Sequence, residues 1–216
     1  HHSNILPWQF LAERKSLKIK VLPVDKNGYL RMDELPLLVS ERTKLCCIAH
    51  ISNVLGIVNP IREISDYCRN RGVLTVIDGA QGVVHCKVDV RALGADFYAF
   101  SGHKLYAAPG TGVLWGRKEL LDRMPPYMGS GEMISSVKWQ GSSFAPVPHK
   151  FEAGTQNMAG VPTLMPAFKW VEEFGKYPEL EGVKHYLLET LPQIEGLRLF
   201  GNPLKVEDKI PLFSFT

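Results

Sequence analysis

The sequence lacks any long hydrophobic run, since its apolar stretches are strand-sized and are interrupted by charged residues. A helix that crosses a membrane needs about 20 consecutive apolar residues, and a signal peptide also needs an uninterrupted apolar core. Neither segment is present. The sequence therefore predicts no membrane partner and a cytoplasmic protein, with an organelle matrix as the alternative location.

Cysteine is also scarce. The four cysteines (Cys46, Cys47, Cys68 and Cys86) show no CxxC spacing, and the first two lie in an apolar run typical of buried thiols. No HExxH motif and no Cys/His pair at metal-ligand spacing occurs. These absences argue against a disulfide framework and against a metal site.

The charges show little excess of either sign. Lys and Arg number 25 and Asp and Glu 22, which gives a net charge of +3, and the positive charges are scattered along the chain. A nucleic-acid partner is therefore not expected. The chain opens on HHSNILPWQF without an initiator methionine and stops within the strand-like KIPLFSFT, so we expect an incomplete piece of a longer protein.

What the sequence does contain is an alternation of strand-like and helix-like segments. Apolar strands are predicted at 17–25, 43–52, 73–81, 95–101 and 111–116, and helices at 31–42, 59–72, 89–94, 117–124, 161–175 and 181–196. Asn59 is the predicted N-cap of the second helix. Apolar strands that alternate with helices indicate an α/β fold with a mainly parallel sheet flanked by helices.

Two parts are expected along the chain. Residues 1–160 form the predicted large domain, in which 125–160 reads as a long Gly, Ser, Pro and Met-rich loop region. Residues 161–216 read as linker helices and the beginning of a smaller α+β C-terminal domain.

Polar side chains follow three of the predicted strands, at the point where each strand ends. They are Ser52 and Asn53 after the first, Asp78 and Gln81 after the second, and Ser101, His103 and Lys104 after the third. Each group alone fits a turn or a helix cap at least as well. Because ligands gather at the carboxyl ends of parallel strands, the three groups together predict one binding site.

This set of side chains suits an aldehyde cofactor that carries a phosphate and a protonatable ring nitrogen. In pyridoxal 5′-phosphate enzymes a lysine forms the Schiff base and a carboxylate keeps the pyridine nitrogen protonated, so that the ring acts as an electron sink. Ser and His donors can bind the phosphate. The main competing phosphate motifs, GxxxxGK[ST] and GxGxxG, do not occur.

Five ordered motifs, SGHKLY, VIDGAQ, HISNVLG, FEAGTQN and the opening HHSNILPWQ, carry a resemblance to a known family. The chain resembles the fold-type I, class V aminotransferase-like enzymes, and most closely the group II (SufS-like) cysteine desulfurases. SGHK, in place of the SAHK common in group I, favours group II. The resemblance covers essentially all 216 residues and implies a mainly parallel, seven-stranded-type sheet.

The resemblance implies a role for each matching residue around the cofactor ring. Lys104 is similar to the Schiff-base lysine that also moves protons, Asp78 to the partner of the pyridine nitrogen, and Gln81 to the donor to the phenolic oxygen. His1 is similar to the histidine that stacks on the ring, and Asn53 to the residue that binds the substrate carboxylate. Lys104 and His1 are the implied catalytic residues.

Three further residues match the family's phosphate ligands. Ser101 and His103 do so from the same strand end, and Thr155 resembles the threonine that reaches the phosphate of the neighbouring subunit, which implies a homodimer. Two departures from the family pattern lie nearby. Gln156 replaces a proline, and Ala107 replaces a glycine, which is tolerable only if that position does not require a positive φ.

The resemblance predicts an enzyme that converts L-cysteine to L-alanine and passes persulfide sulfur to an acceptor protein, usually for iron–sulfur cluster assembly. The family's nucleophilic cysteine and its carboxylate-binding arginines are expected after residue 216, and a further phosphate-binding segment before residue 1. None of the four cysteines matches the nucleophile's motif. The alternatives are a selenocysteine lyase, another class V enzyme such as an epimerase or a kynureninase-like hydrolase, or a non-catalytic fragment.

Overall fold

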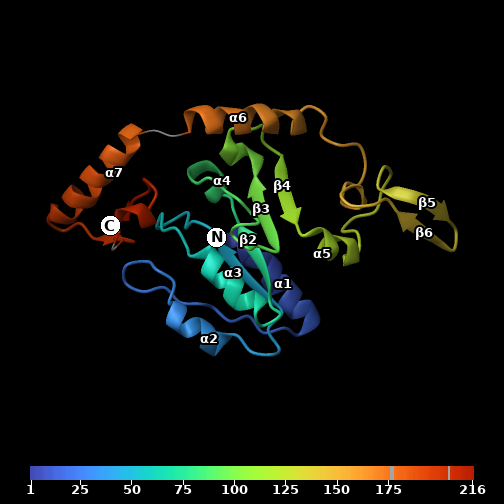
Figure 1. Ribbon diagram of the computed structural model, residues 1–216, viewed down its shortest axis with the longest axis horizontal. Coiled ribbons are helices and arrows are strands. Elements are labelled where there is room, and N and C mark those ends of the chain that lie inside the picture. The colour runs from blue at the N-terminus through green and yellow to red at the C-terminus, as the bar shows by residue number, and fades with distance from the viewer. Residues whose placement is uncertain (176–177, 204) are drawn as a thin grey trace.

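The computed structural model describes residues 1–175, 178–203 and 205–216. At its centre lies a sheet with helices packed against it, and two segments project from this centre on opposite sides (Figure 1). Among the described residues, every helix is too short or too polar to cross a membrane.

The central sheet contains β1 (Leu45–Ala49), β2 (Leu74–Asp78), β3 (Phe97–Ser101) and β4 (Gly112–Gly116), in that order. The first three strands run parallel, and β4 pairs antiparallel with β3. The chain turns back directly through residues 102–111, so β4 returns without the helical crossover that a parallel neighbour needs. The predicted α/β fold with a mainly parallel sheet is confirmed, with four strands of this sheet in the described residues.

Helices surround the sheet. The α-helices are α1 (Leu6–Lys15), α2 (Leu35–Leu38), α3 (Ile61–Arg69), α4 (Gly82–His85), α5 (Lys118–Arg123), α6 (Leu164–Phe174) and α7 (Pro178–Thr190). The 3-10 helices are η1 (His2–Asn4), η2 (Met32–Glu34), η3 (Gly102–Leu105), η4 (His149–Phe151), η5 (Val161–Thr163), η6 (Leu191–Gln193) and η7 (Val206–Asp208).

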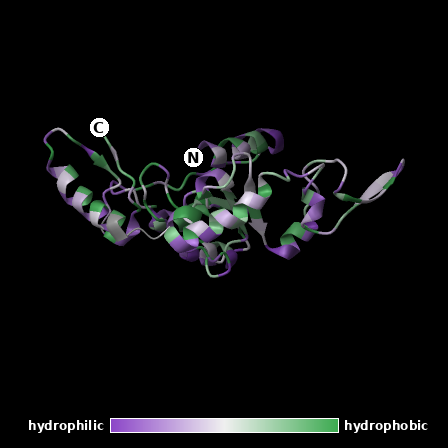
Figure 2. Cartoon of the chain, turned by 90° about the horizontal axis from the view of Figure 1, so that it is seen from above, coloured by the Kyte–Doolittle hydropathy of each residue, from purple (hydrophilic) through white to green (hydrophobic). Residues whose placement is uncertain are grey.

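Two apolar clusters hold these helices to the sheet. In the first, Ile77 of β2 and Tyr98 of β3 pack against residues of α4 and α6. In the second, Ile64 and Cys68 of α3 pack against Leu35 of α2, and Ile48 of β1 packs against both clusters. Each fully buried aliphatic side chain contributes about 1.5–3 kcal/mol. Figure 2 shows apolar residues in this central part and also in both projections.

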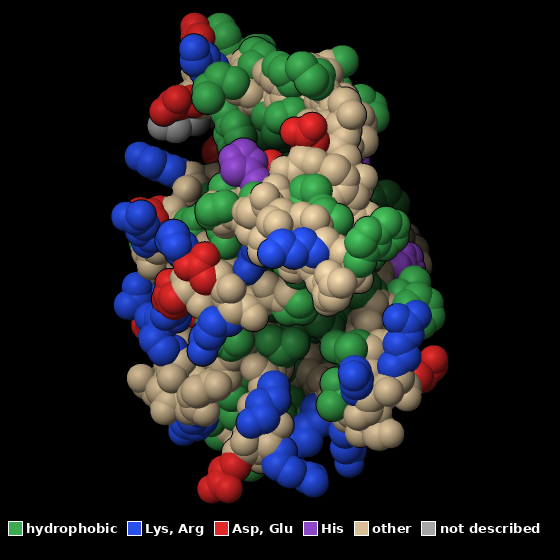
Figure 3. All heavy atoms as spheres, turned by 90° about the vertical axis from the view of Figure 1, so that its right-hand side faces the viewer, with side chains coloured by type: hydrophobic (Ala, Val, Ile, Leu, Met, Phe, Trp, Pro, Cys, Tyr) green, Lys and Arg blue, Asp and Glu red, His purple; other side chains and the backbone are tan. Residues whose placement is uncertain are grey.

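A long arm projects from one side of the centre. It contains the antiparallel pair β5 (Ile134–Lys138) and β6 (Gly141–Phe144), whose residues are all exposed (Figure 1). Trp139, at the tip of this pair, is 102% exposed. From this end of the molecule, apolar side chains lie beside Lys and Arg side chains (Figure 3). An exposed apolar surface of this kind is typical of a contact with another chain.

The opposite projection carries α7 and the small pair β7 (Leu199–Phe200) and β8 (Ser214–Phe215), which are antiparallel (Figure 1). The segment that leads into β8 returns to the centre, where Lys209 forms an isolated antiparallel bridge with Ile57. This end of the chain therefore lies close to the carboxyl end of β1.

The segment 17–25, predicted as a strand, forms none. Its one ladder contact is an isolated antiparallel bridge between Val24 and Leu30. The intervening turn is closed by Asp25, whose carboxylate accepts the backbone N–H groups of Asn27 (2.8 Å) and Tyr29 (3.0 Å). The alternating pattern produced no strand because pairing stops after this one bridge.

Two details of the helix prediction are also wrong. The side chain of Asn59 does not cap α3; it donates instead to the carbonyl of Ala49 at 2.8 Å, and α3 begins after Pro60 without a side-chain cap. Residues 90–94 form turns: the Asp89 carboxylate accepts the N–H groups of Arg91 and Ala92 as a cap would, but the single i→i+4 bond, from the Leu93 N–H to the Asp89 carbonyl (2.9 Å), is not continued, because the chain turns at Gly94 with φ of 68°.

Candidate active site

A pocket of about 480 Å³ lies at the carboxyl ends of β1, β2 and β3. Its lining includes every predicted site residue of the three strand ends except Ser52, together with the predicted residue of the opening stretch: His1, Asn53, Asp78, Gln81, Ser101, His103 and Lys104. The structure thus brings together residues that are up to 103 positions apart, as counted from His1 to Lys104. Thr155 does not line this pocket; it lies exposed on the segment between the arm and α6.

Asp78 occupies the middle of the pocket floor. It is the last residue of β2, and the strand register pairs it with Ala49 of β1 and Ala99 of β3. Both alanines also line the pocket, so the carboxylate has small side chains on either side. Its Oδ1 accepts the backbone N–H of Ala80 at 3.1 Å. A single backbone bond leaves carboxylate lone pairs available to a ligand.

Lys104 is presented by a tight turn directly after β3. The turn closes where the N–H of Gly102 donates to the carbonyl of Thr111 at 2.8 Å and the N–H of Ala107 donates to the carbonyl of Gly102 at 3.0 Å. A Cβ at Gly102 would lie 2.2 Å from the Thr111 Oγ1, so only glycine fits. Tyr106 takes the left-handed conformation, with φ of 68°. Half-buried Lys104 and exposed His103 therefore project from a fixed backbone.

Ala107, which replaces the family's glycine, does not need a positive φ. Among the non-glycine residues, positive φ occurs at Ser16, Tyr106 and Glu132, and Ala107 is not one of them. The alanine side chain is accommodated without backbone strain and is buried in the same cluster as Tyr98. The side chain of Gln156, the other departure, donates to the carbonyl of Gly154 at 3.1 Å.

A buried hydrogen bond supports the pocket from below. The Tyr98 hydroxyl and the His50 Nδ1 are 2.9 Å apart, and both residues are buried. Burial raises the pKa of Tyr98 and lowers the pKa of His50, so both side chains stay neutral at pH 7. A Cβ at Gly79 would lie 1.9 Å from the Tyr98 ring, and one at Gly82 would lie 2.4 Å from the His50 Nδ1. The backbone that carries Gln81 is thereby pressed onto this pair.

One wall of the pocket comes from the start of the chain. His1 lines it, and its Nδ1 accepts the N–H of Ser3 at 3.2 Å. Asn4 and Trp8 also line it, and the Trp8 indole Nε1 donates to the Asn4 Oδ1 at 2.9 Å. The sequence reasoning did not single out Asn4 and Trp8, although both lie inside the motif HHSNILPWQ.

The remaining wall is the loop after β1, residues 52–58, which we name the Asn53 loop. The Ser52 Oγ accepts the N–H groups of Val54 (3.3 Å) and Leu55 (3.0 Å) and so holds the loop closed around Asn53. Asn53 is half-buried and lines the pocket. Ser52 therefore shapes this wall and does not itself face the pocket.

The chemistry of this donor set fits pyridoxal phosphate. The volume lies within the range of about 300–1,000 Å³ that is usual for small-molecule sites. An amine, a carboxylate, an amide, a hydroxyl and an imidazole converge on one cavity, and among the described residues the Lys104 amine makes no hydrogen bond to another side chain. A half-buried amine without a protein partner is a chemically sensible site for covalent attachment of an aldehyde.

Comparison with known proteins agrees with this geometry. The model of the family described as "Aminotransferase class-V" matches residues 1–216. The chain belongs to the aminotransferase class-V family. Members of this family in general depend on pyridoxal phosphate.

Within this family, the chain is similar to proteins that are named cysteine desulfurases. A Xylella fastidiosa protein named "Probable cysteine desulfurase" is 48% identical over 205 residues, which are 93% of this chain and 49% of that protein. The chain thus spans about half the length of the curated relatives it matches.

Two solved structures have the same fold over the whole chain. The crystal structure of the cysteine desulfurase CsdA (S-sulfonic acid) from Escherichia coli superimposes with a TM-score of 0.90 at 35% identity, over 100% of this chain and 54% of that one. The apo structure of a cysteine desulfurase from Thermococcus onnurineus NA1 gives 0.91 at 32% identity, with the same coverage. The similarity to class V enzymes inferred from the motifs is confirmed.

Proposed function

We propose that the protein carrying these residues is a pyridoxal phosphate-dependent cysteine desulfurase, which converts L-cysteine to L-alanine and passes persulfide sulfur to an acceptor protein for iron–sulfur cluster assembly. The observation that carries this proposal is the convergence of Lys104, Asp78 and Asn53 on one pocket. The names of the relatives at 48% and 45% identity support the choice of substrate.

In this proposal Lys104 would hold the cofactor by its aldehyde carbon, and its Nζ would hold and move the substrate's α-proton. Asp78, which lies between the ends of β1 and β3, would keep a proton on the pyridine nitrogen. When bound, the cofactor supplies an electron sink for the charge left by that proton. Gln81 would donate to the phenolic oxygen and His1 would stack on the ring, and both line the pocket.

Phosphate binding is assigned to Ser101, the last residue of β3, and to His103 in the η3 turn that follows it. Thr155 lies outside the pocket of its own chain, which agrees with a role at the site of a second copy. The exposed apolar arm, with Trp139 at its tip, is the surface available for such a homodimer. Asn53 is assigned to the substrate carboxylate by its match to the family motif, and it lines the same pocket from the loop after β1.

The sulfur nucleophile has no candidate in this pocket. Among the described residues, no cysteine lines it, and burial raises the pKa of both Cys47, to about 12, and Cys86. Such thiols stay protonated at neutral pH and attack sulfur slowly. We therefore assign the persulfide-forming cysteine to a part of the protein outside these 216 residues.

The division into a cofactor-binding part, 1–160, and the start of a second part, 161–216, is part of the same proposal.

Replacing Lys104 tests the proposed function. In Lys104→Ala the protein should lose its yellow, lysine-bound cofactor and fall to background in alanine formation from L-cysteine, because no amine remains to hold the aldehyde. Borohydride reduction of the wild type should give a covalent adduct that peptide mass spectrometry locates on Lys104. Lys20→Ala is the control, since the exposed Lys20 donates to the Leu38 carbonyl away from the pocket.

Three results would contradict the proposal. A wild-type protein that stays colourless with pyridoxal phosphate would exclude the cofactor. An adduct on another lysine would exclude the assignment of Lys104. Turnover of L-selenocysteine without turnover of L-cysteine would replace the desulfurase by a lyase.

A further inference from the structure

We propose that Lys209 is a positioning residue for substrate binding, which holds the Asn53 loop against the pocket from behind. The proposal rests on the function assigned to Asn53 above. Lys209 is 1% exposed, and its Nζ donates to the backbone carbonyl of Leu55, two residues after Asn53. It does not line the pocket.

Lys209 belongs to a segment, residues 208–214, that we name the strap. The strap contacts the Asn53 loop at successive backbone positions. The N–H of Val58 donates to the Asp208 carbonyl (2.8 Å), and the N–H of Ile210 donates to the Gly56 carbonyl (2.9 Å). These ladder bonds hold the far side of the loop.

Side chains add two further bonds between strap and loop. The Ser214 Oγ donates to the Val54 carbonyl at 2.6 Å, and the Lys209 Nζ donates to the Leu55 carbonyl. The carbonyls on the two residues that follow Asn53 are therefore both bound by strap side chains. A displacement of either carbonyl moves the peptide chain that carries the Asn53 amide.

The loop transmits such a displacement because it is closed on itself. Its ends are joined by the N–H of Ser52, which donates to the Ile57 carbonyl (2.9 Å), and by the N–H of Gly56, which donates to the Ser52 carbonyl (3.0 Å). Gly56 has φ of 71°, and a Cβ there would lie 3.0 Å from the Leu212 carbonyl oxygen. The strap thus lies directly against the loop backbone, with no side chain between them.

Burying the Lys209 amine costs desolvation free energy. Burial lowers the pKa of Lys209 to about 8, and its surroundings include the Phe213 ring, whose centroid is 5.3 Å from the Nζ. An apolar side chain of similar length would pack here without that desolvation penalty. What the apolar side chain cannot supply is a donor to the Leu55 carbonyl. The hydrogen bond is therefore the feature that the lysine contributes.

The test compares Lys209→Met and Lys209→Arg with the wild-type protein in its cofactor-loaded form. Lys209→Met should raise the KM for L-cysteine about tenfold, because one hydrogen bond that fixes the loop is lost. The affinity for pyridoxal phosphate and its bound absorbance should stay unchanged, and kcat should change by less than KM. Lys209→Arg, which keeps a donor, should recover part of the lost KM.

Lys150→Met is the matched control. Lys150 is also buried, and its Nζ donates to the Asp122 carbonyl at 2.9 Å, but it lies away from the pocket. We expect both Lys150→Met and Lys209→Met to lower the melting temperature. Lys150→Met should leave the KM for L-cysteine unchanged. If Lys209→Met is too unstable to purify, Ser214→Ala removes the neighbouring bond and should raise the KM two- to fivefold, for the same reason.

A double-mutant cycle with Asn53→Ala makes the test specific. If Lys209 acts through Asn53, adding Lys209→Met to Asn53→Ala should raise the KM no further. The positioning role is overturned if Lys209→Met changes only the melting temperature, as the control does, or if its effect on KM adds in full to that of Asn53→Ala. A wild-type protein that binds pyridoxal phosphate but shows no response to L-cysteine would overturn the proposed function instead, which keeps the two failures apart.

Discussion

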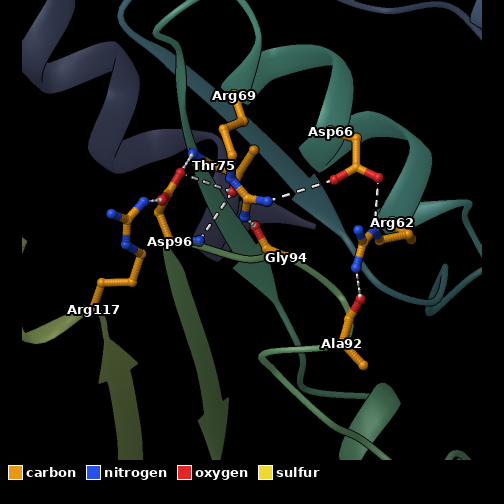
Figure 4. A network of polar contacts seen from close by, with 8 residues as sticks. All are labelled: Arg62, Asp66, Arg69, Thr75, Ala92, Gly94, Asp96 and Arg117. Atoms are coloured by element: carbon orange, nitrogen blue, oxygen red, sulfur yellow. Dashed lines mark hydrogen bonds and ion pairs between the residues drawn. The ribbon is translucent and has the colours of Figure 1, made fainter.

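At the amino-terminal end of the central sheet the Asp96 carboxylate is saturated, whereas at the carboxyl end the Asp78 carboxylate accepts one backbone N–H. Asp96 accepts the N–H of Thr75 (2.9 Å), the Thr75 hydroxyl (3.3 Å) and the Arg117 guanidinium (2.8 Å) (Figure 4). Asp78 accepts the N–H of Ala80 at 3.1 Å. Asp78 ends β2 and Asp96 directly precedes β3, the neighbouring strand, and their surroundings give them opposite roles.

The saturated end continues into a wider network. Arg69 donates to the Gly94 carbonyl (2.6 Å) and Arg62 to the Ala92 carbonyl (2.7 Å), while Asp66 pairs with Arg62 (Figure 4). These bonds tie α3 to the turn that leads into β3. Because every charged group shown has a protein partner, this end of the sheet contributes stability and offers little to a ligand.

The number of protein partners separates the two acids. A buried acid with three partners holds elements together, and an acid in a cavity with one partner has acceptor capacity left for a ligand. Four measurements test this difference, in order of decreasing expected effect.

Asp78→Asn should lower alanine formation by about a hundredfold to a thousandfold, because an amide cannot hold the proton on the pyridine nitrogen. The melting temperature should change little, since one backbone bond is kept by the amide oxygen. Steady-state kinetics and thermal unfolding of the same preparation measure both effects. A variant with normal activity would show that Asp78 is structural like Asp96.

Asp96→Ala should cost about 3 kcal/mol of stability, because the N–H of buried Thr75 and the Arg117 guanidinium both lose their partner. Chemical denaturation measures the free energy of unfolding. At temperatures where the variant is folded, cofactor binding should equal that of the wild type. Weakened cofactor binding with unchanged stability would reverse the roles assigned to the two ends.

Tyr98→Phe should cost about 1.5 kcal/mol, because the buried His50 Nδ1 loses its hydrogen-bond partner. This pair lies behind the pocket at the carboxyl end and is saturated, so it should behave like Asp96 and not like Asp78. Equilibrium unfolding should show the loss of stability, as for Asp96, and the KM for L-cysteine should stay unchanged. A changed KM would place the pair with Asp78. Adding His50→Leu to the Tyr98→Phe variant should recover part of the loss, since both polar partners are then gone.

The smallest effect is a pH dependence from Lys209. Its pKa is about 8 in the folded protein and near 10.5 otherwise, so the unfolded chain binds more protons between these values. Stability must therefore rise with pH in this window, by about 1 kcal/mol from pH 8 to pH 9. Denaturation of the wild type relative to Lys209→Met isolates this contribution. A difference that falls or stays flat with rising pH would contradict the burial of this amine.

Much of the fold could be predicted because its strands and helices have strong local patterns. The apolar stretches that form β1, β2 and β3 and the spacing of Ile61, Ile64 and Cys68 in α3 indicate the alternation directly. The segment 17–25 has an equally good pattern and forms no strand. The segment 17–25 differs from β1, β2 and β3 because no strand pairs with it beyond the bridge between Val24 and Leu30. The sequence of a segment does not specify which strand will pair with it.

The convergence of the candidate residues on one pocket was also predicted from the sequence. The strand-end rule brought Asn53, Asp78 and Lys104 to one place, because parallel strands end at one edge. Asn4 and Trp8 were not identified, since they reach the pocket through the packing of α1 and η1 and not through a strand end.

The sequence alone supplies the chemical groups of the candidate site and their order along the chain, since DGAQ and SGHK each begin at the last residue of a strand and SNVLG follows one. Which polar groups are saturated and which face the pocket depends on the tertiary structure. Asp78 and Asp96 look alike in sequence, each beside an apolar strand. The partners of Asp96 come from positions 21 residues away, and those contacts form only when the strands pair. The same holds for Lys209, whose bond to the Leu55 carbonyl joins residues 154 positions apart.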